Sequence, residues 1–290
     1  MTRLPTGIGT VFRREIATIA RTPGYSVLPL GLFAVLGGIV AVGGGGTTGF
    51  VPAVVDVLLP AELLVPLVAV VVGYRALLTD TASGEIAVIR TYPVTVTGYV
   101  GGILLARLVA VLVIVLIPFG LIGVYIWLTA APDTGIFATH TGVDSPVLYL
   151  RFLALVAGLG AVFLTLSAAI SALVSSRQSA IALAVIALVA GTLGGDLAIL
   201  RGLTSGTAPS EISAQLVRTP NGAFRGLVFE YVIGVSFTPD TSVVAASRAV
   251  ASMVGWTALG VGVSVITVRY RASVDRTIER LRHRVQRRRQ

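Results

Sequence analysis

The chain has 290 residues, of which 55% are hydrophobic and only 12% charged, with a mean hydropathy of +0.92 and a net charge of +9. Soluble domains carry about a quarter charged residues, so this apolar excess cannot be buried in one soluble core and predicts a multi-pass membrane protein.

All 22 basic residues are arginine, and cysteine is absent. This composition excludes a phosphate-binding or Schiff-base lysine, disulfides and thiolate metal sites. We therefore expect no enzymatic activity and no bound cofactor or metal. Nucleic acid is not expected as a partner, since nine of the arginines lie in 269–290 beside a hydrophobic span.

The first predicted element is a basic amphipathic helix over residues 7–22. Its apolar side chains recur at helical spacing, opposite Arg13, Arg14 and Arg21; they are Ile8, Val11, Phe12, Ile16 and Ile19. A helix of this kind lies in the membrane interface and does not cross the bilayer. We therefore assign residues 1–24 to a cytoplasmic interfacial helix in contact with membrane lipid. The alternative is an ordinary positive flank of the first span.

Six segments are long and apolar enough to cross a bilayer core, which needs about 20 residues per helix. They are residues 25–43, 58–79, 101–131, 148–175, 178–197 and 247–268. The predicted fold class is an all-α membrane protein of the cell membrane, with a six-span transmembrane domain over 25–268. Both termini are expected in the cytoplasm, because 17 of the 22 arginines then lie on that side.

The middles of these predicted spans contain no ionisable residue. Glu62, Arg107 and Asp196 all fall near predicted span ends, where water or snorkelling can solvate them. Ion-coupled carriers and intramembrane enzymes need ionisable groups inside the hydrocarbon, so the sequence weighs against both classes. A His-Glu-x-x-His motif is also missing, which argues against a zinc protease.

The fourth span carries Ser167, Ser171 and Ser175 at every fourth position. Small polar residues on one stripe allow close helix packing and hydrogen bonds between helices. They could equally line a substrate path, and the sequence leaves both interpretations open.

Two segments at the C-terminal side are less apolar. Residues 198–246 form a long external loop, in which Ser210 is a plausible helix cap and the aromatic content favours short or re-entrant helices over disorder. Residues 269–290 form a basic cytoplasmic tail. The tail acts either as a positive-inside anchor or as a binding segment for anionic lipid or a soluble partner.

Two segments resemble the type-2 ABC transporter permeases. FRREIATIARTPGY, which includes Phe12, Arg13, Arg14 and Glu15, is similar to the amphipathic segment of that family, where an arginine-glutamate pair precedes the first span. The polar stretch GYRALLTDTASGEIAVIRTYPVTVTGYVGGILLAR is similar to the connection between the second and third spans. The matching positions are Asp80, Gly84, Glu85, Pro93 and Gly101 or Gly102. Asp80 departs from the family, in which a glutamate-arginine pair is commoner.

The resemblance implies that residues 79–93 form a cytoplasmic coupling helix that docks into a separate ABC ATPase subunit. Its expected contact residues are Asp80, Ser83, Gly84, Glu85, Ile86, Ile89, Arg90 and Pro93. Residues 79–91 can form a short helix with apolar knobs and a charged rim; from the residues alone, a solvated loop is the alternative. ATP and Mg would be bound by the partner subunit, and the permease would act as a homodimer or with a second permease.

Residues 219–232, TPNGAFRGLVFEYV, are similar to the segment after span five of NosY-like permeases, which serve copper-site maturation of nitrous oxide reductase. The order differs, since Pro220 precedes Asn221 and Phe224-Arg225 replaces Tyr-Arg. The predicted function is a membrane-spanning permease subunit of an ABC transporter that moves an unidentified substrate. The alternative is a non-transporting membrane scaffold or anchor for a cytoplasmic partner.

Overall fold

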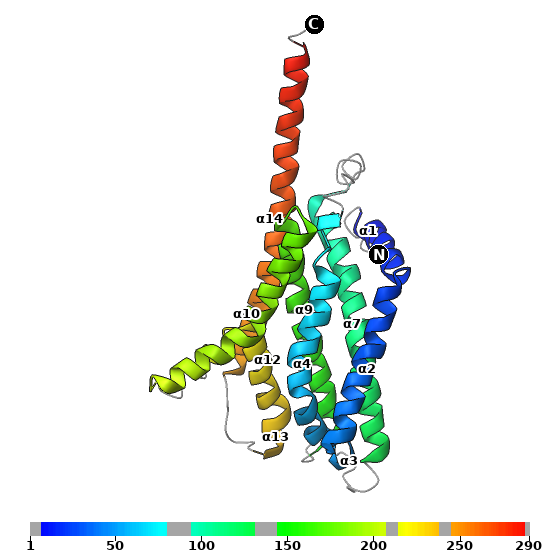
Figure 1. Ribbon diagram of the computed structural model, residues 1–290, viewed down its shortest axis with the longest axis vertical. Coiled ribbons are helices and arrows are strands. Elements are labelled where there is room, and N and C mark those ends of the chain that lie inside the picture. Colours follow the sequence, from blue (N-terminus) through cyan, green and yellow to red (C-terminus); the bar gives the residue numbers. More distant parts are fainter. Residues whose placement is uncertain (1–6, 80–93, 131–143, 207–213, 238–244, 288–290) are drawn as a thin grey trace.

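The computed structural model describes residues 7–79, 94–130, 144–206, 214–237 and 245–287 (Figure 1). Regular secondary structure in these ranges is entirely helical. Both the first helix and the far end of the last helix lie toward the same end of the bundle, which we call the α1 end (Figure 1). The opposite end, where the short helix α3 (Gly45–Thr48) lies, is the α3 end.

Six helices are long and apolar enough to cross a membrane, which confirms the predicted all-α, multi-span architecture. They are α2 (Pro23–Gly43), α4 (Phe50–Gly73), α7 (Val96–Thr129), α9 (Pro146–Leu173), α10 (Arg177–Thr204) and the first part of α14 (Ala246–Arg287). The largest difference from the predicted boundaries is at α4, which begins eight residues before the predicted position 58.

Shorter helices complete the chain. Helix α1 (Ile8–Ala20) precedes α2 at the α1 end. Between α10 and α14 lie α12 (Pro220–Val228), the π-helical turn η1 (Phe229–Ile233) and α13 (Gly234–Phe237). Short helices therefore do occur within 198–246, whereas the predicted cap Ser210 lies outside the described residues.

Side-chain oxygens set the starts of several helices. Thr95, Ser145 and Ser176 accept hydrogen bonds from backbone amides in the first turns of α7, α9 and α10, which satisfies amides that have no partner within the helix. The start of α4 is fixed from outside the helix. The Asp144 carboxylate, just before α9, accepts from the amides of Phe50 at 2.7 Å and Val51 at 3.0 Å.

Helices α4, α7 and α9 form the core of the bundle. In the most apolar stretch of each, 56% of the residues are buried, against 17%, 18% and 22% in α2, α10 and α14. Aromatic side chains from all three helices pack together; they are Phe50 on α4, Phe119 on α7, and Tyr149 and Phe152 on α9. The outer faces of α2, α10 and α14 are apolar and exposed, as expected for surfaces that meet lipid or a partner subunit.

Helices α9 and α14 approach closely at Gly260. A Cβ atom there would lie 2.6 Å from the backbone carbonyl carbon of Thr165, whereas a Cβ at Gly255 on the same helix would meet nothing within 4 Å. We expect Gly260→Ala to destabilise the protein by about 1–3 kcal/mol through overpacking. Gly255→Ala should leave stability unchanged or raise it, because alanine favours helix. Thermal unfolding in detergent measures both, and equal melting temperatures would contradict the assigned packing.

Candidate functional site

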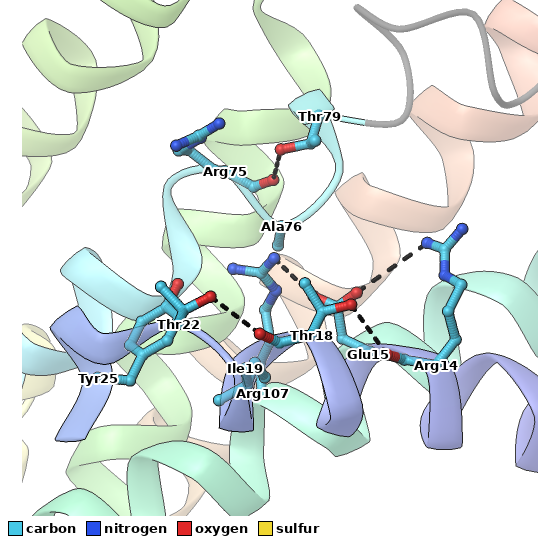
Figure 2. Close-up of a pocket in the computed structure, with 10 residues that line it drawn as sticks. All are labelled: Arg14, Glu15, Thr18, Ile19, Thr22, Tyr25, Arg75, Ala76, Thr79 and Arg107. Carbon is cyan, nitrogen blue, oxygen red and sulfur yellow. Dashed lines mark hydrogen bonds and ion pairs between the residues drawn. The ribbon is translucent and has the colours of Figure 1, made fainter.

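A buried ion pair joins α1 to α7 at the α1 end (Figure 2). Arg107 Nη2 lies 2.6 Å from Glu15 Oε1, and the two side chains are only 9% and 7% exposed. Arg107 Nη1 also donates to the carbonyl oxygen of Val72, near the end of α4. One guanidinium group therefore links three helices. The prediction that water or snorkelling serves Arg107 is wrong, because α1 covers this side chain.

Two serines of α9 bond to α4 and to the turn that follows it. Ser167 Oγ donates to the carbonyl oxygen of Val70 at 3.2 Å. Ser171 Oγ donates to Ala168 within its own helix and accepts from the amide of Leu77 at 3.0 Å. Ser175 does not continue the stripe, because α9 ends at Leu173 and Ser175 is exposed beyond it. These contacts favour a packing role for Ser167 and Ser171.

The residues expected to contact an ATPase, from Asp80 to Pro93, lie outside the described residues. Their flanks are fixed on the bundle. Leu77 and Leu78 are buried on one side, and Val94 on the other side lies against Gly7 at the start of α1, where a Cβ would come within 2.8 Å of Val94 Cγ1. The polar connection therefore leaves and rejoins the bundle at the α1 end.

The residues predicted for the interfacial helix divide between two environments. Arg13 and Arg14 are exposed, Phe12 is half-buried and Glu15 is buried. Glu15 thus belongs to the interior contact with Arg107. Sequence reasoning missed this pair, because nothing in the local pattern connects two charges that are separated by two spans.

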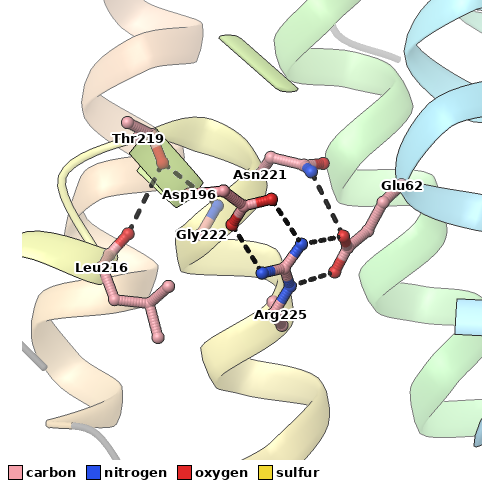
Figure 3. A network of polar contacts seen from close by, with 7 residues as sticks. All are labelled: Glu62, Asp196, Leu216, Thr219, Asn221, Gly222 and Arg225. Atoms are coloured by element: carbon pink, nitrogen blue, oxygen red, sulfur yellow. Dashed lines mark hydrogen bonds and ion pairs between the residues drawn. The ribbon is translucent and has the colours of Figure 1, made fainter. Parts of the chain in front are cut away.

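A second charged cluster lies inside the bundle (Figure 3). It consists of Glu62 on α4, Asp196 on α10, and Asn221 and Arg225 on α12; we call it the charged cluster. Arg225 Nε donates to Glu62 Oε1 at 2.7 Å, and Arg225 Nη2 pairs with Glu62 Oε2. The Asp196 carboxylate receives Nη1 at 2.6 Å and Nη2 at 3.2 Å. One guanidinium therefore binds two carboxylates, and the three charges sum to one negative charge.

The local sequence of α12 explains how these groups are presented. Thr219 Oγ1 caps the helix by accepting from the amide of Gly222, and Pro220 occupies the first turn, where its missing N–H is harmless. Asn221 and Arg225 are four residues apart and so share one face of α12. The start of α12 is held against α14 by Trp256, whose Nε1 donates to the carbonyl oxygen of Arg218 at 2.9 Å.

Burial varies across the charged cluster. The Glu62 side chain is 4% exposed, Arg225 21% and Asp196 43%. Asn221 is buried and donates to Glu62 Oε2 at 3.4 Å, while its own Oδ1 has no hydrogen-bond partner among the described residues. A π-helical turn, η1, follows α12 directly, and such turns are frequent at functional sites.

The prediction that the span middles lack ionisable groups is wrong. Glu62 lies near the middle of α4 and Asp196 lies well inside α10, because both helices extend beyond the predicted spans. The predicted start of this span was too late because residues 44–57 contain four glycines and Asp56, a composition typical of a loop. Arg225, which the sequence placed in the loop over 198–246, lies on α12 at the centre of the charged cluster.

Fold and site together define a helical, multi-pass membrane architecture with charged groups inside the bundle. No protein-family model matches this chain, and no curated protein matches it in sequence. Within the described ranges, no group of three histidine, cysteine or acidic residues is arranged to hold a metal ion.

Proposed function

We propose that this chain is the membrane-spanning permease subunit of an ABC transporter and moves a substrate across the cell membrane with energy from a separate ATPase subunit. In this proposal the α1 end faces the cytoplasm, and residues 79–93 form the coupling segment that contacts the ATPase. ATP and Mg are bound by that partner. The observation that supports the proposal best is that the residues on both sides of this segment, Leu77 and Val94, contact helices of the bundle.

The anchoring contacts provide a mechanical route from the coupling segment into the bundle. Leu77, three residues before Asp80, bonds to Ser171 on α9. The preceding end of α4 bonds to α9 through Ser167 and to α7 through Arg107. A displacement of residues 79–93 would therefore be transmitted to the three core helices, which is what a conformational switch driven by an external ATPase requires.

The composition and the outer surfaces fit this assignment. The chain contains no lysine, so the lysine that binds ATP phosphates in a P-loop must belong to another chain. The exposed apolar faces of α2, α10 and α14 leave room for a second permease copy as well as lipid. We therefore propose a homodimer or a paired permease, each copy with one ATPase.

Charge reversal at Glu85 tests the coupling role. We expect the full chain to co-purify from mild detergent with an ATPase. In the proposal Glu85 pairs with a basic residue of the ATPase, so Glu85→Arg should reduce permease-dependent ATP hydrolysis by tenfold or more, because like charges would then meet at the interface. The matched control is Arg201→Glu, which reverses an exposed charge on α10. Failure of wild-type protein to retain an ATPase, or unchanged hydrolysis in Glu85→Arg, would contradict the proposal.

A second candidate is an ion-coupled carrier, which the charged cluster favours. Carboxylates inside membrane helices mark proton or ion pathways in many transporters, and Glu62 is such a group. Liposomes that contain only this chain discriminate between the candidates. Proton uptake driven by a pH gradient, and lost in Glu62→Gln, would support the carrier and contradict dependence on an ATPase.

A further inference from the structure

An apolar groove of about 670 Å³ lies between α9 and α14. Its lining runs from Ala154 to Val162 on α9 and from Val250 to Gly262 on α14, with residues three or four positions apart that share one face of each helix. The buried side chain of Leu227 on α12 closes the bottom, whereas Val250 and Val254 are exposed at the rim. The groove is therefore open to the surroundings of the bundle.

The lining of this groove matches an aliphatic chain. Among the described lining residues, Thr257 alone has a polar side chain, and its hydroxyl donates to the carbonyl oxygen of Met253 in the same helix. Gly262 adds room, since a Cβ at this position would meet nothing within 4 Å. A polar ligand would lose its hydration here and gain almost no hydrogen bonds in return.

A second hollow, of about 460 Å³, continues the groove toward the start of α9. The two hollows share Ala154 and Leu155, and the second is also lined by Arg151 and by Tyr231 of η1. Arg151 is exposed, and within the described ranges its guanidinium has one contact, a hydrogen bond of 3.2 Å from Nη1 to the carbonyl oxygen of Tyr231. The other N–H groups of this guanidinium are available to an anion, and phosphate oxygens fit them well.

The dimensions of the groove match a phospholipid in one leaflet of a bilayer. Helix α9 has 28 residues, or about 42 Å at 1.5 Å per residue, against a hydrocarbon core of about 30 Å. Its first turns therefore reach the headgroups, and Arg151, in the second turn, lies at their boundary with the core. Between Val250 and Gly262 the groove follows α14 for about 18 Å. One acyl chain spans half of the core, about 15 Å.

We propose that the groove and Arg151 together bind one phospholipid, with an acyl chain between α9 and α14 and the phosphate at Arg151. Charge complementarity selects this occupant. An apolar helix of a second copy could cover the groove, but it would leave Arg151 without an anion, and so would a lipid that has no phosphate. The inference goes beyond the proposed transport role and holds whether or not the chain couples to an ATPase.

Native mass spectrometry of the full chain tests the phosphate contact, because it counts both bound lipids and protein copies. Delipidated protein in mild detergent is titrated with dioleoylphosphatidylglycerol and with dioleoylglycerol, which has the same acyl chains but no phosphate. We expect one phosphatidylglycerol per chain, bound about tenfold more tightly than the neutral lipid. Arg151→Gln should remove this difference. Arg201→Gln, which removes an exposed charge on α10, should retain it.

A second pair of variants tests the groove without a change of charge. Gly262→Leu places a side chain in the open part of the lining and should weaken phosphatidylglycerol binding about tenfold, because the acyl chain loses apolar contacts. Gly255→Leu is the matched control. A Cβ at Gly255 also meets nothing within 4 Å, but Gly255 does not line the groove, so this variant should bind lipid as wild type does.

Four results would overturn the proposal. Equal binding of the two lipids would exclude a phosphate contact, and equal weakening in the two leucine variants would place the acyl chain elsewhere. A wild-type dimer that Gly262→Leu converts to a monomer, with an unchanged lipid count, would assign the groove to a second copy. Displacement of the lipid by inorganic phosphate would indicate a soluble anion. The two pairs are independent, so either one suffices if a variant of the other does not elute as the wild-type peak.

Discussion

Replacing Arg225 by glutamine is expected to lower the free energy of unfolding by about 3–5 kcal/mol, the usual effect of removing one partner from a buried ion pair. Glu62, which is 4% exposed, would keep its charge without a counter-ion, and only the 3.4 Å contact from Asn221 would remain at Oε2. Asp196 contributes less, because its side chain is 43% exposed. Thermal unfolding in detergent should show a fall of roughly 10 °C in melting temperature.

Two further variants separate the ion pair from a general loss of charge. Arg248→Gln removes an exposed arginine on α14 and should change stability by less than about 0.5 kcal/mol. The double variant Glu62→Gln/Arg225→Gln should recover much of the loss, because the buried uncompensated charge is gone. The charged cluster would be contradicted if Arg225→Gln had the same melting temperature as wild type. It would also be contradicted if the double variant had a lower melting temperature than Arg225→Gln.

Replacing Arg107 by glutamine is expected to have an effect of similar size, about 3–5 kcal/mol, for the same reason. Glu15 would be left buried on the inner face of α1 with only the 4.0 Å contact to Arg14, and the carbonyl oxygen of Val72 would lose its donor. Helix α1 is joined to α7 through this pair, so its detachment should precede unfolding of the bundle. Limited proteolysis measures the detachment, as faster cleavage near Arg13 and Arg21.

The control for Arg107 lies on the same segment. Arg21→Gln removes an exposed arginine just after α1 and should alter neither proteolysis after Arg13 nor melting. Glu15→Gln/Arg107→Gln should be more stable than Arg107→Gln, because two neutral amides can share a hydrogen bond. Rapid cleavage of α1 in wild-type protein would contradict the buried contact.

Hydropathy predicted the number of long helices but not the start of α4. The six apolar runs are local, since each contains enough hydrophobic residues to define a span by itself. The start of α4 is set by Asp144, whose carboxylate caps it across 94 and 93 residues of sequence. Residues 44–57, with four glycines and one aspartate, contain no local sign that a helix begins at Phe50. Glu62 was therefore assigned to the end of a span.

For the polar stretch around Glu85, sequence and structure contributed different information. Its composition and its resemblance to a permease family suggested a coupling segment, and that role stays a prediction because residues 80–93 lie outside the described part of the chain. The structure adds the setting of this stretch: its flanks are fixed next to α1, α7 and α9. The sequence does not predict these contacts, since α1 and Val94 are separated by two spans.

The sequence by itself determined a helical membrane protein with six apolar spans and no lysine, because length, hydropathy and composition are local quantities. Tertiary structure alone decided which charges meet. Glu62 and Arg225 are 163 residues apart, and Glu15 and Arg107 are separated by two spans. A buried charge is tolerated only when packing brings its partner within bonding distance, and that proximity depends on the arrangement of the whole bundle.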